Sequence, residues 1–255
     1  MNSINPEQFM AGIPIKVFDN QSKELCKVYP VTLREIAEVG AKNFYSYLNV
    51  FTLNKEDIDE YFSQQAEIDG DFTPFQFLLV LTQVDPQYLV TAQMAFKMFL
   101  HEDSVSFLAQ NEAIVLGDIK EERVINNELF EQIRTYVQAA NLLDTQSAEA
   151  KMDNPSDAKA AQIIKKLKEG RKAREKAKSG SELTFSDLVA SLAAGGNGLN
   201  ILNIWDLTYY AFNDQFKRMQ MREEYENSYR SILAGADPKK VKLKYWISNI
   251  QDKDK

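Results

Sequence analysis

The sequence contains very few of the residues from which disulfides and common metal sites are built. Cys26 and His101 are the single cysteine and the single histidine among 255 residues. One cysteine excludes an internal disulfide framework and agrees with a reducing compartment. The common zinc sites cannot form within this one chain, so only carboxylate-rich metal sites stay open. We predict no cofactor and no metal site.

Long apolar runs and a targeting signal are also missing. No stretch approaches the roughly 18 consecutive apolar residues of a membrane span, and the start, MNSINPEQFMAG, lacks the basic patch and apolar run of a signal peptide. We expect a cytoplasmic protein without membrane contact. The net charge of −7 and pI near 5.0 argue against general nucleic-acid binding, which needs a positive field.

The N-terminal part predicts a β-hairpin. Two β-prone runs, residues 13–18 and 25–31, flank a group of turn-forming residues. Pro14 and Pro30 cannot donate hydrogen bonds within a sheet, so they should lie at strand ends or on an outer edge.

A helix should follow the hairpin directly. Thr32 and Glu35 have the spacing of a capping box, in which each side chain satisfies a main-chain N–H of the first turn. The apolar spacing carries this helix to about Phe51, with Gly40 tolerated inside it. Asn54 should cap a second helix.

The next segment continues the pattern of an α+β domain. Proline at the first helical position predicts helices over residues 74–83 and 86–100. The first of these is almost wholly apolar, so it should be buried at the centre of the core. Short β-prone runs at 105–108 and 113–116 predict a second hairpin, and a helix is expected over 127–143.

The composition changes after this domain, so we predict three parts. Residues 1–143 form an α+β domain, 144–181 a charged flexible linker, and 182–255 a C-terminal helical module. Within the linker, residues 159–178 hold nine Lys or Arg against two Glu, a local charge of +7. This segment is either a solvated linker or exposed helix, or a basic arm that touches nucleic acid or an acidic partner.

The C-terminal module begins with a short predicted helix over residues 184–194. It ends at the glycine cluster 195–198, which lacks the continuation of a phosphate-binding loop and is interpreted as a turn. A long helix with an aromatic ladder follows. Its members, spaced four, three, four and three residues apart, are Trp205, Tyr209, Phe212, Phe216 and Met219.

This ladder is the main candidate for a functional surface. Continued to Leu233, the helix would have about 30 residues and a length of about 45 Å. Its far half shifts phase, with apolar positions at Met221, Tyr225, Tyr229 and Ile232. The ladder can fill a domain core or form an interaction surface. We interpret it, together with Trp246, as a helix-in-groove contact with a partner or a second copy of the chain.

The sequence gives only weak signals for a catalytic site or a calcium-binding site. His101, beside Glu102 and Asp103, is either a general base or a structural or surface histidine, and no serine or cysteine nucleophile pattern accompanies it. The acidic runs 57–60 and 69–71 do not follow the spacing of an EF-hand loop. We therefore expect a protein that is not an enzyme.

Two blocks of the sequence resemble phage tail assembly chaperones of phages and prophages of Gram-positive bacteria. They are VYPVTLREIAEVGAKNFYSYL, at residues 28–48, and IWDLTYYAFNDQFKRMQ with SILAGADPKKVKLKYW, within residues 204–246. The resemblance implies a protein that binds the helix-rich tape-measure protein, keeps it soluble and leaves as the tail tube polymerises. It also implies a short form and a frameshift-extended form, and the predicted linker fits that layout.

Three other classes of function stay open at this point. The chain could be a structural part of the tail or baseplate, a nucleic-acid adaptor that uses residues 159–178, or an enzyme that relies on carboxylates brought together by the fold. The interpretation that we favour is a non-catalytic tail assembly chaperone with a mainly helical α+β fold.

Overall fold

The computed structural model describes most of the chain outside its middle. The described residues are 5–54, 58, 72–118, 123–141, 184–195, 198–238, 240, 241, 243 and 245–247.

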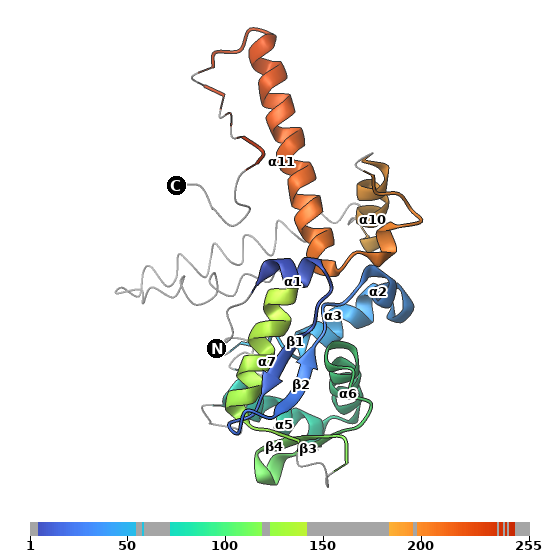
Figure 1. Ribbon diagram of the computed structural model, residues 1–255, viewed down its shortest axis with the longest axis vertical. Helices are drawn as coiled ribbons and strands as arrows, with labels where there is room; N and C mark the ends of the chain where they lie inside the picture. The colour runs from blue at the N-terminus through green and yellow to red at the C-terminus, as the bar shows by residue number, and fades with distance from the viewer. Residues whose placement is uncertain are drawn as a thin grey trace, which may run out of the picture. The chain divides into compact units, whose positions relative to one another are not determined.

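The chain divides into two compact units. One contains Met1–Leu143 together with Trp205–Lys255, and the other contains Asp144–Ile204 (Figure 1). The predicted linker, including the basic segment 159–178, lies outside the described residues. So does most of the helix predicted beyond Asn54. The predicted domain boundaries therefore remain predictions. The fold class is confirmed, because the elements are mainly helices with small antiparallel sheets.

The first predicted hairpin is present. Strand β1 (Ile15–Phe18) pairs antiparallel with β2 (Glu24–Val28). The Asp19 side chain accepts hydrogen bonds from two main-chain N–H groups of the turn, each at 2.8 Å, which closes it. Pro14 and Pro30 lie just outside the strands, as predicted. A short helix that the sequence pattern did not predict, α1 (Pro6–Met10), precedes the hairpin.

The predicted capping box of Thr32 and Glu35 is confirmed, but the helix that it starts is shorter than expected. Helix α2 (Leu33–Val39) ends at Gly40, and α3 (Ala41–Asn49) begins directly after it. The prediction of one continuous helix to Phe51 is wrong because Gly40 has a φ of 83°. That conformation suits glycine and turns the chain between the two helices.

The two helices that begin with proline are confirmed. Helix α5 (Pro74–Val84) starts at a capping box between Thr73 and Gln76, and α6 (Pro86–Leu100) starts at Asp85, whose side chain accepts a hydrogen bond from the first turn. Six of the eleven residues of α5 are buried, so it does lie in the core.

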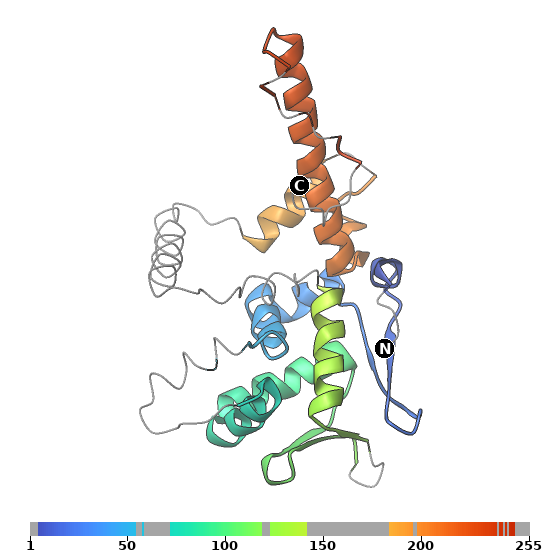
Figure 2. The ribbon, with the colours of Figure 1, turned by 90° about the vertical axis from the view of Figure 1, so that its left-hand side faces the viewer.

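The second hairpin is part of a larger sheet than predicted. Strand β3 (Val105–Leu108) pairs with β4 (Ala113–Leu116), and the two-residue strand β5 (Val124–Ile125) adds to the other edge of β4. Helix α7 (Asn127–Ala140) follows with one face buried, as expected. The β1–β2 hairpin lies alongside α7, as Figure 2 shows.

A cluster of phenylalanine rings joins the helices of the N-terminal domain. The fully buried ring of Phe51 lies 5.3 Å from Phe96, 5.6 Å from Phe99 and 6.0 Å from Phe130, measured between ring centroids. These separations are typical of tilted and edge-to-face aromatic pairs, which add to the free energy of simple burial.

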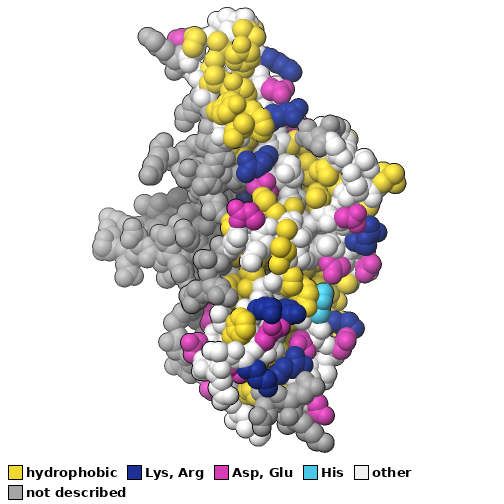
Figure 3. All heavy atoms as spheres, viewed as in Figure 1, with side chains coloured by type: hydrophobic (Ala, Val, Ile, Leu, Met, Phe, Trp, Pro, Cys, Tyr) yellow, Lys and Arg dark blue, Asp and Glu magenta, His cyan; other side chains and the backbone are white. Residues whose placement is uncertain are grey.

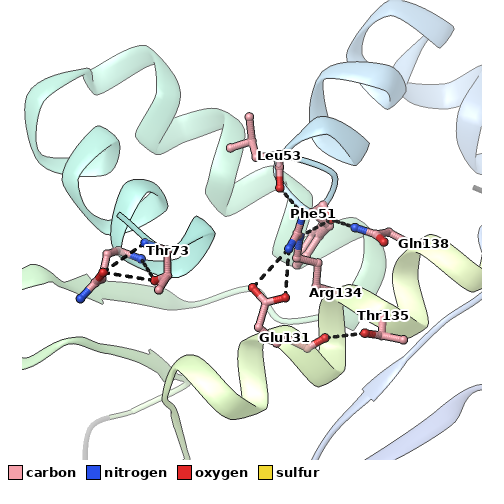
Figure 4. Close-up of polar contacts among 8 residues, drawn as sticks. Phe51, Leu53, Thr73, Glu131, Arg134, Thr135 and Gln138 are labelled. Carbon is pink, nitrogen blue, oxygen red and sulfur yellow. Dashed lines mark hydrogen bonds and ion pairs between the residues drawn. The ribbon is translucent and has the colours of Figure 1, made fainter. Parts of the chain in front are cut away.

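Arg134 of α7 ties this helix to the chain that follows α3 (Figure 4). Its guanidinium donates hydrogen bonds to the carbonyls of Phe51 and Leu53, and Gln138 donates a second one to Phe51 at 2.6 Å. Glu131 accepts from the same guanidinium at 2.9 Å. A single side chain thus satisfies two carbonyls beyond the end of a helix.

We predict that Arg134→Met lowers the free energy of unfolding by about 1.5 to 3 kcal/mol, because hydrogen bonds from a charged donor to partly buried carbonyls are lost. Urea unfolding followed by circular dichroism measures the change. The control is Thr135→Ala at the next, exposed position of α7, which should change stability by less than about 0.5 kcal/mol. Equal effects of the two substitutions would contradict this role.

Candidate partner-binding site

The long C-terminal helix begins later than the aromatic ladder predicts. Helix α11 spans Tyr209–Leu233, 25 residues, and Thr208 is its N-cap, accepting from the Ala211 N–H at 3.1 Å. Trp205 lies in the 3-10 helix η3 (Ile204–Asp206). The prediction that Trp205 shares one α-helical stripe with the other four residues is wrong, because Thr208 has an extended backbone that interrupts the helix.

The start of α11 is joined to the start of α2 by main-chain hydrogen bonds. Leu33 N–H donates to the Leu207 carbonyl at 2.9 Å, and Tyr209 N–H donates to the Val31 carbonyl at 2.7 Å. These bonds form an antiparallel bridge around Thr208. The buried Thr208 hydroxyl also donates to the Phe9 carbonyl at 2.9 Å, which ties α1 to the same point.

The first turns of α11 are anchored in the N-terminal domain. The Tyr209 ring lies edge-on to Phe44, with centroids 5.0 Å apart, and Tyr210 lies 5.6 Å from Phe9. Phe212 is 1% exposed. Burial, followed by a hydrogen bond with Tyr45, raises the pKa of Tyr209. The near part of the predicted ladder is therefore used to hold the helix in place.

The rest of α11, from Gln215 to Leu233, has no buried residue, and we call it the far part of the helix. Every position in it is half-buried or exposed, although apolar residues recur along it. Phe216 and Met219 are half-buried, Tyr229 is 48% exposed and Leu233 is 70% exposed. Hydrophobic side chains gather over the far part of α11 and the tail beside it (Figure 3). Such a gathering on a protein surface is typical of an interaction site.

The described residues between 235 and 247, which we call the tail of the chain, turn back along the far part of α11. Gly235, with a φ of 98°, ends α11 in a Schellman motif, in which Ala236 N–H donates to the Ser231 carbonyl at 3.0 Å. Tyr245 then lies perpendicular to Tyr225, with ring centroids 5.6 Å apart. Trp246 is half-buried, and its ring centroid lies 6.3 Å from that of Tyr245.

The predicted partner-binding residues therefore do not form one continuous stripe. Phe212 and Phe216 are ring neighbours at 6.1 Å, and Met219 is the next member of the ladder. Trp205 lies outside the helix, and Trp246 lies beside the far part. Four further apolar residues of the far part and the tail are not among the predicted site residues, although the phase shift at Met221 lies near the start of this stretch. They are Tyr225, Tyr229, Leu233 and Tyr245.

His101, the candidate general base, makes packing contacts with neighbouring side chains. His101 is the left-handed C-cap of α6, and its ring stacks on Tyr29 with centroids 3.7 Å apart. Its Nε2 atom lies 3.8 Å from a carboxylate oxygen of Glu35. Within the described part of the chain, no three His, Cys, Asp or Glu side chains gather as a metal site would require. The acidic runs 57–60 and 69–71 lie outside the described residues, apart from Ile58.

In the part of the chain that the structure describes, no helix is both long enough and apolar enough to cross a membrane.

Comparisons with known proteins single out the C-terminal part. Residues 174–251 match the family described as YomV second domain, which is associated with phages and prophages. No curated protein and no solved structure matches the chain. The matched range contains all of α11 and the described tail. The part of the chain that relates it to phage proteins is therefore also the part that carries the candidate surface.

We predict that the two parts of α11 respond differently to truncation of an aromatic side chain. Phe212→Ala should lower the free energy of unfolding by about 3 to 5 kcal/mol, because it opens a cavity in the core. Tyr229→Ala should cost less than about 1 kcal/mol, since this ring is half exposed and loses mainly its stacking on Tyr225. Thermal and urea unfolding of both variants measure the contrast. Similar losses would show that the far part is also core.

We also predict that Cys26 is protected from thiol reagents in the folded chain. Burial, with a smaller contribution from Glu102, raises the pKa of its thiol from 9.0 to about 12. At pH 8 the reactive thiolate is then about a thousandfold rarer than in the unfolded chain. Iodoacetamide labelling with and without urea, followed by mass spectrometry, tests this. Equal labelling rates in the two conditions would contradict it.

Proposed function

We propose that this chain is a phage tail assembly chaperone that binds the helical tape-measure protein and keeps it soluble during tail assembly. The match of residues 174–251 to a phage-associated family supports a phage-related role. The resemblance of two sequence blocks to tail assembly chaperones supports the narrower one.

The observation that carries the proposal is the unburied apolar face of α11. Beyond its first turns the helix carries methionine and tyrosine side chains, including Met219, Met221 and Tyr225, at positions that are only half-buried. Aromatic and methionine side chains offer a large contact area, and methionine adapts its shape to different partners. A helical client that exposes its own apolar stripe fits such a face.

The energetics suit a partner that is held and later released. Each well-buried anchor contributes about 1.5 to 3 kcal/mol before the cost of ordering side chains and losing free motion. Several such anchors together can bind the client while the binding stays reversible. In this proposal Phe216, Met219 and Trp246 contact the client, whereas Tyr209 packs against Phe44 of the N-terminal domain and Phe212 is buried. A contact of Trp205 with the client stays a prediction.

Co-expression with the tape-measure protein encoded nearest to this chain tests the proposal. The full chain should keep that protein soluble and co-purify with it. The double variant Tyr229→Asp and Leu233→Asp should remain folded, since both side chains are exposed, but lose the client because charges enter the apolar contact. Circular dichroism checks the fold of each variant.

The matched control uses another exposed apolar pair with the same helical spacing. Val90 and Met94 of α6 are 50% and 43% exposed, so Val90→Asp with Met94→Asp introduces the same charges elsewhere. This variant should still hold the client. A client that stays insoluble with the full chain would contradict the chaperone role. Recovery of the chain at fixed stoichiometry from purified particles would instead favour a structural tail component.

A further inference from the structure

Strand β1 forms an open edge of the two-stranded β1–β2 sheet, and the hairpin lies on the outside of α7 (Figure 2). Successive residues of a strand direct their main-chain groups alternately toward the paired strand and away from it. Asp19 N–H donates to the Lys23 carbonyl, across the hairpin, at 3.0 Å. The one irregularity in the register adds a residue to β2 and leaves β1 regular. The main-chain groups of Val17 therefore face β2, and those of Lys16 and Phe18 face the open side.

The outward main-chain groups of these two residues are available to another strand. Among the described residues, no third segment exchanges a main-chain hydrogen bond with Lys16 or Phe18. The edge strand β3 of the other sheet differs, because its Phe107 carbonyl accepts a hydrogen bond from the Gln83 side chain of α5 at 3.2 Å. An unoccupied strand edge is a template for the addition of a further strand.

The side chains beside this edge combine an aromatic ring with positive charge. Lys16 and Phe18 are exposed, on the face opposite the buried side chains of β1. Lys27 lies directly opposite Lys16 in the register, and like charges at opposed positions are unfavourable. Glu24 lies 2.7 Å from the Lys16 ammonium and 3.5 Å from that of Lys27, so one carboxylate serves two lysines. A second carboxylate on the open side of Lys16 would balance the second lysine.

We infer that the open edge of β1 binds an extended acidic segment of a partner protein as a third strand. The main chain of this segment pairs with the outward groups of Lys16 and Phe18. An acidic residue of the segment lies beside Lys16, and a β-branched or aromatic residue two positions away lies beside Phe18. Lys16 also makes the edge selective, because a charged side chain on an edge strand disfavours pairing with a purely apolar strand.

The inference goes beyond the proposed function, since it concerns a different surface and makes no use of α11. Only two residues of β1 offer outward main-chain groups, so the added strand is short and its binding is reversible. Complementary charge then decides which segment binds.

Three labelled nine-residue peptides test the inference with the full chain. Each has valine two positions before and after its central residue, so that either strand direction fits, and threonine elsewhere. The central residue is glutamate in the first peptide and lysine in the second, and the third is the glutamate peptide with methyl groups on its three central main-chain nitrogens. Fluorescence anisotropy should show the glutamate peptide binding at least about fivefold more tightly than the lysine peptide and about tenfold more tightly than the methylated one.

Charge reversal on the edge tests the role of Lys16. Lys16→Glu should invert the preference, so that the lysine peptide binds more tightly than the glutamate peptide. The matched control is Lys42→Glu, at an exposed lysine of α3, which should leave both affinities unchanged. Circular dichroism checks that each variant is folded. If Lys16→Glu does not fold, Lys16→Gln should remove the preference without inverting it.

Amide exchange measured by NMR locates the contact. The glutamate peptide should slow the exchange of the Lys16 and Phe18 N–H groups, because they become hydrogen-bonded. The Val17 N–H group, which already faces β2, should change little.

Five results would each overturn the inference. They are no detectable binding of the glutamate peptide, equal affinities for the glutamate and lysine peptides, undiminished binding of the methylated peptide, equal effects of the two lysine reversals, and tighter binding of a labelled thymidine oligonucleotide than of the glutamate peptide. The co-expression experiment with the tape-measure protein can fail without affecting any of these results, so the two proposals are tested separately.

Discussion

The structure depends on a short antiparallel contact between two helix starts. Residues 31–33 and 207–209 exchange main-chain hydrogen bonds of 2.9 and 2.7 Å, and each segment then enters a capped helix. Because these segments are far apart in the chain, this contact brings the C-terminal helix onto the N-terminal domain. Thr208 serves three purposes there, since it bridges to Thr32, caps α11 and donates to the carbonyl of Phe9.

The same contact divides α11 into an anchored part and an open part. Tyr209 packs against Phe44 of the N-terminal domain and Phe212 is buried, and burial of such aromatic side chains supplies much of the free energy that holds the helix in place. The far part gains little from the fold, yet it keeps its apolar residues. Exposed apolar residues gathered in this way are typical of an interaction surface, and the tail that returns beside the far part extends that surface.

Local signals in the sequence predicted most of the elements, whereas contacts between distant segments were not visible. The capping box at Thr32, the prolines that begin helices and both hairpins were correct, because these signals act over a few residues. The break at Gly40 was missed, because apolar spacing does not report a positive φ. Phe212 is buried whereas Phe216 and Met219 are half-buried, and this difference comes from tertiary packing, so the ladder could not be divided into core and surface from its spacing alone.

Hydrogen–deuterium exchange of the full chain, with and without the tape-measure protein, would show where the client binds. Peptides covering residues 208–214 should be protected in both conditions, because they belong to the folded core. Peptides covering residues 219–247 should gain protection only when the client is present. Unchanged exchange in that region, with new protection confined to the N-terminal domain, would show that the client binds elsewhere and that the far part of α11 is not the binding surface.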